Sequence, residues 1–344
     1  MSAPAEAPVR VAMRQDVLLV LLSVLCLIGF TLSLLTGPAG LGIGRALGAL
    51  VLGGRDADAA VLIMREVRLP RALLGFMIGG ALGLAGAALQ GYLRNPLAEP
   101  GLIGVSAGAT LGAVMVIHLG LVGLGTLMLP LGGLAGALVA VLLVLGLSGL
   151  RAGPMTLILA GVAVTSFAGA MTSLVLNLSR NPFAATEIVF WMLGSLADRS
   201  LVHVALAGAL MVPGVALLLS VGRSLDALTL GEDTAASLGI NLAGVRARVV
   251  AGTALAVGAA TAVAGAISFV GLVIPHLLRP LVGHQPGRLL LPSFLSGASL
   301  VLLADVAIRV FRPDNELKLG VLTALIGAPF FFWLVLRADR DSPP

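Results

Sequence analysis

Long apolar segments with almost no charge constrain this chain more than any other feature of its sequence. Hydrophobic residues make up 58% of its 344 residues, charged residues make up 11%, and the mean hydropathy is +1.09. A soluble domain carries about 25% charged residues. The apolar residues suffice for roughly ten helical spans of about 20 residues each. The composition therefore predicts an all-α, polytopic membrane protein with one transmembrane domain, residues 1–344.

Ten spans separated by polar connections are expected along the chain. Their approximate ranges are 17–36, 71–91, 102–118, 121–148, 155–178, 201–221, 246–268, 269–283, 289–311 and 318–336. The first run is long for a signal-peptide core and lacks an A-x-A-like cleavage site, so residues 1–16 are expected to form a short N-terminus before a retained span. The longest polar segments are expected at 37–70, 179–200 and 222–245.

Glycine is abundant in these runs, with 45 residues in the chain. Pairs spaced four apart, such as Gly79 with Gly83 and Gly132 with Gly136, lie on one face of a helix. Such small-residue faces let membrane helices approach closely. We therefore expect close helix contacts at both pairs, a pattern that carries no information about a substrate.

Two polar segments between the spans stand out. Residues 94–101 hold two prolines, an acid and a base, and such a turn must face water or protein because its backbone groups would lack partners in lipid. Residues 226–239 form a short helical pattern with early acids, and Gly239 suits its C-terminal stop. That helix is too short and polar to span the membrane. It is either a surface helix for docking or a plain connecting helix.

Five motifs in this order resemble the FecCD-type permeases, the membrane subunits of ABC importers for ferric siderophores, haem and vitamin B12. They are RNPLAEPGLIGVSAGA at 94–109, FWMLGSL at 190–196, LGEDTAASLG at 230–239, FVGLVIPHLLR at 269–279 and ELKLGVLTALIGAPF at 316–330. The likeness extends from about Val67 to Leu336. Lys318 departs from the family pattern, which usually has proline there.

The resemblance implies a type II ABC importer architecture in the inner (plasma) membrane. It implies a homodimer of ten-helix subunits with the translocation path along the dimer interface, two cytoplasmic ATPase subunits and one periplasmic binding protein. An even number of spans places both termini on one side, and we expect that side to be cytoplasmic. Lys and Arg are divided almost equally between the two sides, so charge alone does not orient the chain.

The resemblance also implies roles for particular residues. The region 226–242 resembles the coupling helix that seats in the ATPase, and the turn at 94–101 is expected on the same side. The coupling residues carried over are Leu230, Gly231, Glu232, Ala235, Leu238 and Gly239. By the same resemblance, the fifth span borders the path, so Asn177 and Arg180 at its outer end are candidates for contact with an anionic substrate. An interfacial anchor is the alternative for Arg180.

Three arginines on the opposite side are candidates for docking the binding protein. Arg68 and Arg71 are three apart, so they share a helix face, and Arg309 ends the ninth span. The resemblance implies that they receive a glutamate from each lobe of the binding protein, and the planar guanidinium suits bidentate carboxylate binding. Interfacial snorkelling is the alternative.

Other polar residues in the spans favour structural roles. Asp305 lies four residues before Arg309, which predicts an ion pair within one helix. His276 and Arg279 follow Pro275 at the end of a span, which predicts a polar contact at that helix end. His276 and His284 have no Cys or carboxylate cluster beside them, so no metal site or cofactor is expected.

The leading function is the membrane subunit of a binding-protein-dependent importer of a metal chelate of the iron-siderophore type, or of haem or cobalamin. The single lysine, Lys318, follows Leu317, so the chain has no G-x-x-x-x-G-K-[ST] phosphate loop and cannot itself be the ATPase. An ion-gradient-driven secondary transporter is the main alternative. An intramembrane enzyme would need a nucleophile–base pair or metal cluster, and a nucleic-acid role would need a basic patch with aromatics. The sequence offers neither.

Overall fold

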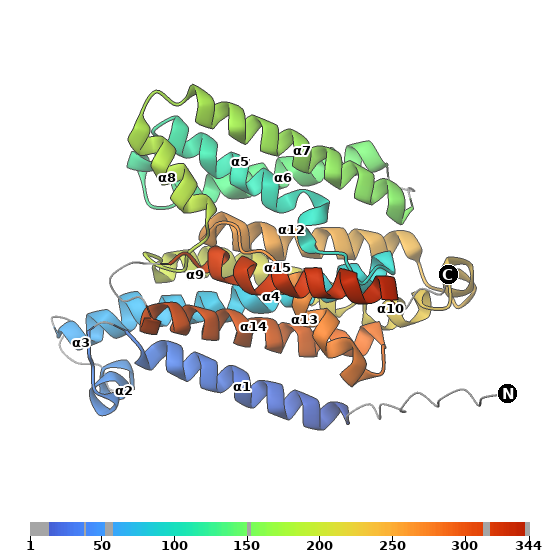
Figure 1. Cartoon of the computed structure of the whole chain (residues 1–344), viewed down its shortest axis with the longest axis horizontal. Helices are drawn as coiled ribbons and strands as arrows, with labels where there is room; N and C mark the ends of the chain where they lie inside the picture. Colours follow the sequence, from blue (N-terminus) through green and yellow to red (C-terminus); the bar gives the residue numbers. More distant parts are fainter. Residues whose placement is uncertain (1–13, 38, 52–57, 150–152, 312–316, 341–344) are drawn as a thin grey trace.

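The computed structural model describes residues 14–37, 39–51, 58–149, 153–311 and 317–340. Within these residues every regular element is a helix, which confirms the predicted all-α class. The longer helices lie roughly along one common direction and form a layered bundle (Figure 1). The start of α1 and the end of α15 lie at the same end of the bundle as α10 (Figure 1), as an even number of crossings requires.

Ten helices of the described chain follow the predicted spans closely. They are α1 (Gln15–Leu35), α4 (Leu69–Leu93), α5 (Val105–His118), α6 (Met128–Ser148), α7 (Pro154–Leu178), α9 (Leu201–Leu219), α12 (Leu242–Ala264), α13 (Val270–Leu278), α14 (Pro286–Phe311) and α15 (Leu319–Arg340). The shorter elements are α2 (Ile43–Val51), α3 (Ala59–Leu62), α8 (Pro182–Met192), α10 (Gly222–Leu228) and α11 (Glu232–Ser237), with η1 (Ile63–Arg68), η2 (Pro100–Ile103), η3 (Leu121–Leu124) and η4 (Arg279–Val282).

Seven helical stretches of the described chain are long and apolar enough to cross a membrane, and three shorter apolar helices occupy the remaining predicted ranges. The shorter three are α5, α13 with η4, and the part of α15 from Leu319 to Leu334. Because α5 starts only at Val105 and α12 ends at Ala264, both boundaries differ from the predicted 102 and 268 by a few residues.

Two segments that the sequence analysis assigned to polar connections contain further helix. Residues 37–70 include α2, α3 and the π-helical η1, which runs directly into α4. Residues 179–200 include α8, whose start is capped by the Asn181 side chain accepting from Phe183 N. These helices are too short or too interrupted to produce a span-length apolar run, which is why hydropathy alone did not identify them. Lys318, at the start of α15, lies 5.9 Å from the centre of the Phe190 ring of α8.

Close glycine contacts join the central helices. A Cβ on Gly79 or Gly83 of α4 would overlap backbone atoms of α14 at Gly297 and Ser293. Likewise, Gly132 and Gly136 of α6 lie against α5. Both predicted small-residue faces are therefore confirmed as helix contacts, and van der Waals packing at this distance holds helices together in lipid, where burial of apolar surface drives association little.

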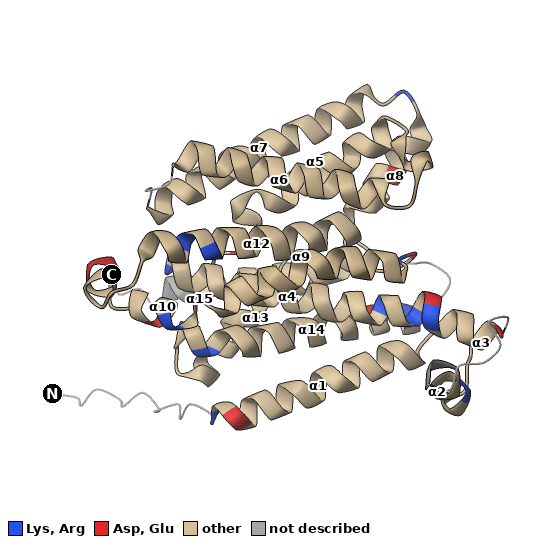
Figure 2. Ribbon diagram, turned by 180° about the vertical axis from the view of Figure 1, so that it is seen from behind, with Lys and Arg blue, Asp and Glu red and all other residues tan. Residues whose placement is uncertain are grey.

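Charged side chains gather at the two ends of the bundle and leave a nearly uncharged middle (Figure 2). The outer faces of helices such as α1, α6 and α7 expose large apolar side chains, including Leu27, Leu142 and Phe167. An apolar belt between two polar ends is the distribution that a bilayer requires. The polar groups that can support function are therefore concentrated at the ends.

Candidate functional site

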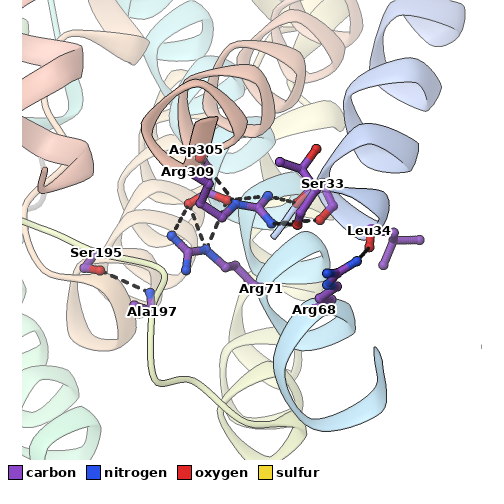
Figure 3. A network of polar contacts seen from close by, with 9 residues as sticks. Ser33, Leu34, Arg68, Arg71, Ser195, Ala197, Asp305 and Arg309 are labelled. Carbon is purple, nitrogen blue, oxygen red and sulfur yellow. Dashed lines mark hydrogen bonds and ion pairs between the residues drawn. The ribbon is translucent and has the colours of Figure 1, made fainter. Parts of the chain in front are cut away.

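At the end of the bundle that holds α3, four charged residues form a cluster, here called the arginine cluster: Arg68, Arg71, Asp305 and Arg309 (Figure 3). Arg68 ends η1 and Arg71 lies in the first turn of α4, while Asp305 and Arg309 lie one turn apart on α14. The close α4–α14 packing brings these side chains together, because glycines on the contact face let the two backbones approach.

Asp305 is the anion at the centre of the arginine cluster. Its carboxylate accepts from Arg71 Nε at 3.0 and 3.1 Å and lies 2.9 Å from Arg71 Nη2. Arg309 Nη2 lies 2.9 Å from the other carboxylate oxygen. The predicted pair between Asp305 and Arg309 is therefore confirmed, while the second partner, Arg71, was not foreseen.

The remaining donors of the arginine cluster bind the C-terminal end of α1. Arg68 Nη1 donates to the carbonyls of Leu34 and Leu35 at 3.1 and 2.9 Å. Arg309 Nη1 donates to the carbonyls of Ser33 and Thr36 at 2.9 and 2.6 Å. The last carbonyls of a helix have no partner within it and carry partial negative charge. The two guanidinium groups therefore cap α1 and fix it to α4 and α14.

Charge and burial make the arginine cluster unusual. The four residues hold three guanidinium groups and one carboxylate, which pairs with Arg71 and Arg309, so they carry an excess of two positive charges. Only 13% of the Arg71 side chain, 8% of Arg309 and 2% of Asp305 are exposed. All three predicted docking arginines are thus brought together, with internal partners for each. Their role in docking stays a prediction.

At the opposite end of the bundle, α10 and α11 form the connection between α9 and α12 (Figure 2). The predicted short helix is α11, which follows Gly231 at φ 102° and ends before Gly239 at φ 83°. Both glycines adopt backbone conformations that L side chains rarely reach. The predicted helical pattern included Asp226. This residue belongs instead to α10, because the helical structure is interrupted between Thr229 and Gly231.

The α11 segment packs against the bundle on one side and is exposed on the other. Ala235 is buried, whereas Leu230 and Leu238 on either side of the helix are each 63% exposed. Arg94 Nη2, at the end of α4, lies 3.3 Å from Glu232 Oε1, so the turn at 94–101 and α11 are in contact, as expected from placing them on one side. Leu230 and Leu238 are thus two large apolar side chains exposed at a polar end of the molecule, and their role in coupling stays a prediction.

The α10 helix is tied to the bundle by a separate contact. Asp226 Oδ1 accepts from Gly287 N at 2.7 Å, in the first turn of α14. The carboxylate therefore satisfies a helix N-terminal N–H and complements the helix dipole. The structure therefore joins α10 to α14 through Asp226 and α11 to the end of α4 through Glu232.

The residues predicted for the translocation path take part neither in the arginine cluster nor in the contacts of α10 and α11. Asn177 and Arg180 are exposed at the end of α7, which is the end of the bundle that also holds α3 (Figure 1). Their proximity to a substrate stays a prediction. No group of three or more metal-ligating His, Cys, Asp or Glu side chains lies in the part of the chain that the structure describes.

Comparison with known proteins matches residues 25–337 to the FecCD transport family. The chain is 39% identical over 275 residues to the Fe(3+) dicitrate transport system permease protein FecD of Escherichia coli K12, covering 80% of this chain and 85% of that one. It is 38% identical over 337 residues to the vitamin B12 import system permease protein BtuC of Escherichia coli O6:H1, covering 96% and 98%.

Two further matches agree with the similarity to transport permeases. The uncharacterized ABC transporter permease protein YvrB of Bacillus subtilis strain 168 is 41% identical over 294 residues, covering 84% of this chain and 83% of that one. Among solved structures, an inward-facing conformation described as a metal-chelate type ABC transporter superposes with a TM-score of 0.82 at 32% identity, covering 94% of this chain and 99% of the other.

Proposed function

The chain belongs to the FecCD transport family, and we propose that it is the permease subunit of a binding-protein-dependent ABC importer. Its apolar helices of span length and its similarity to transport permeases support a multi-pass subunit of the inner membrane, and we assign ATP hydrolysis to a separate partner subunit. We propose a metal chelate as the cargo, of the ferric-siderophore type, or haem or cobalamin. The observation that carries this proposal is the family match over nearly the whole chain.

We place the energy-coupling surface on α11. Leu230 and Leu238, which flank α11 on either side, are exposed, while Ala235 within the helix is buried. A partner ATPase that covers these leucines would move α11 together with α4 and α14, through Arg94–Glu232 and Asp226–Gly287. This end then faces the cytoplasm, and both termini lie on that side. Two copies of the permease with two ATPase subunits complete the proposed assembly.

The arginine cluster then faces the periplasm, where we propose that it receives acidic side chains of the binding protein. Its excess of positive charge supports this assignment, because complementary charge steers association and fixes orientation. The C-terminal end of α7 lies at the same end of the bundle (Figure 1), and we place its neighbours Asn177 and Arg180 at the mouth of the translocation path along the homodimer interface.

Replacing Arg68 by glutamine tests docking without leaving an acid unpaired, since the hydrogen bonds of Arg68 in the described structure go to carbonyl oxygens. We expect the affinity for the binding protein to fall about tenfold, equivalent to about 1.4 kcal/mol, when measured by surface plasmon resonance on the reconstituted importer. Arg45→Gln, an exposed arginine at the same end, serves as control and should bind normally. Unchanged affinity of a folded Arg68→Gln permease contradicts the docking role.

Uptake by proteoliposomes tests the function itself. We expect radiolabelled ferric chelate to accumulate only with the ATPase subunit, the binding protein and ATP all present, and an imposed proton or sodium gradient to add nothing. Omission of any one component should reduce uptake to the level of empty liposomes. Accumulation driven by the gradient alone would refute the importer assignment.

One residue gives the ion-coupled alternative a specific test. Glu99, in the turn between α4 and η2, is partly buried, and this burial raises the pKa of its carboxyl. Asp305 is already paired with two arginines, so Glu99 is the better candidate for a proton carrier. Gradient-driven uptake that disappears in Glu99→Gln would establish the secondary transporter instead.

A further inference from the structure

A polar pocket of about 300 Å³ lies at the same end of the bundle as α11, between α4, the end of α10 and the α13–η4–α14 hairpin. Its polar lining consists of Gln90, Arg94, Thr229, Arg279 and His284. No acidic side chain is among the residues that line it. The proposed importer function uses Arg94 of this lining, through its contact with Glu232, but neither Arg279 nor the space itself.

Arg279 is held in position by a neutral group. Gln90 Nε2 donates to the carbonyls of Gly271 and Leu272, both at 3.3 Å. These two bonds fix the amide so that its Oε1 accepts from Arg279 Nη2 at 2.7 Å. The predicted polar contact at this helix end is therefore present for Arg279. Its partner is an amide oxygen, so the contact positions the guanidinium without neutralising it.

The charge balance of the pocket is positive. Within the described chain, Gln90 is the only hydrogen-bond partner of the Arg279 side chain. The second arginine, Arg94, shares a single 3.3 Å contact with Glu232, and Asp226 is engaged by Gly287 N. Two guanidinium groups and a histidine therefore line a space that has no carboxylate in its lining.

The hairpin beside this pocket also exposes an apolar surface. Leu277 and Leu281, on either side of Arg279, and Leu291 in the second turn of α14 are all exposed. A group that places a phosphate on Arg279 and acyl chains along these leucines would satisfy both features. Basic pockets between helices at the cytoplasmic side of membranes bind anionic lipid head groups.

We propose that this pocket binds a phosphate group, with Arg279 as its main ligand and Arg94 and His284 as additional donors. The neighbouring leucines favour an anionic phospholipid as the source of that phosphate over free inorganic phosphate. A bound lipid there would bridge α4, α14 and the segment before α11, and so stiffen the support of the coupling surface.

Lipid binding to the purified full-length permease in detergent tests the proposal. We expect native mass spectrometry to detect bound phosphatidylglycerol but not bound phosphatidylcholine. We also expect phosphatidylglycerol to raise the midpoint of thermal unfolding of the permease. In Arg279→Gln the affinity for phosphatidylglycerol should fall at least tenfold. Arg288→Gln removes one charge from the same hairpin outside the pocket lining and should bind as the native chain does. His284→Asn, which leaves the Gln90–Arg279 bond intact, should weaken binding severalfold and keeps the test valid if Arg279→Gln fails to fold.

Inorganic phosphate, added without lipid, distinguishes the two sources. If millimolar phosphate raises the midpoint of the native chain but not of Arg279→Gln, and phosphatidylglycerol adds nothing, the pocket is a phosphate site with the free anion as ligand. Binding of phosphatidylglycerol that is unchanged in both Arg279→Gln and His284→Asn overturns the proposal. It is also overturned if Arg279→Gln weakens association with the ATPase subunit while phosphatidylglycerol binding stays normal, because the pocket would then hold a carboxylate of that protein.

Discussion

Replacing Asp305 by asparagine is expected to lower the free energy of unfolding by about 3–5 kcal/mol, the cost of breaking a buried ion pair from one side. The carboxylate is 2% exposed and contacts both Arg71 and Arg309. Its loss leaves two guanidinium groups close together without a counter-charge. Since Arg309 also caps α1, we expect α1 to separate from the bundle first.

The midpoint of unfolding in mixed micelles, followed by circular dichroism, measures this effect. Asp58→Asn is a matched control, because Asp58 pairs with Arg45 at 3.4 Å with 42% and 69% of the two side chains exposed. Exposed pairs contribute about 0–1 kcal/mol, so the control should unfold almost as the native chain does. Equal midpoints for the two variants would show that the arginine cluster does not hold the bundle together.

Replacing Leu230 and Leu238 together by glutamate is expected to reduce ATP-dependent uptake at least tenfold, and to leave the permease folded. Both side chains are exposed, so the substitution removes little internal packing. In the proposed assembly it buries two carboxylates against the ATPase, and unpaired charge in an interface costs several kcal/mol.

Uptake by proteoliposomes and co-purification of the ATPase measure the two consequences. Leu124→Glu supplies the control, because this exposed leucine of η3 lies in the connection between α5 and α6, away from α11. It should retain native uptake. Native uptake by the double variant would remove α11 from the coupling surface.

Much of the fold could be predicted from the sequence, because the signals involved are local. A run of about 20 apolar residues must be helical in a bilayer, since only then are its backbone groups paired. Glycine spacing identified the contact faces at Gly79 and Gly132, and Gly239 marked the end of α11. Asp305 and Arg309 are one helical turn apart, so their pairing also follows from position in the sequence alone.

The shorter helices were not predicted, because prediction relied on these same local signals. The π-helical η1 and the 11-residue α8 produce no long apolar run, so segments 37–70 and 179–200 resembled plain connections. Their helical structure depends on caps and on packing against neighbouring helices, to which hydropathy does not respond.

The sequence by itself determined an all-α membrane protein, its spans and the residue types at each end. Only the tertiary structure decided which of those residues meet: Arg71 with Asp305, Arg94 with Glu232 and Arg279 with Gln90, pairs separated by 234, 138 and 189 residues. The physical reason is that helix formation depends on neighbours along the chain. Helix pairing in lipid depends on how small side chains fit across the contact, which no single helix specifies.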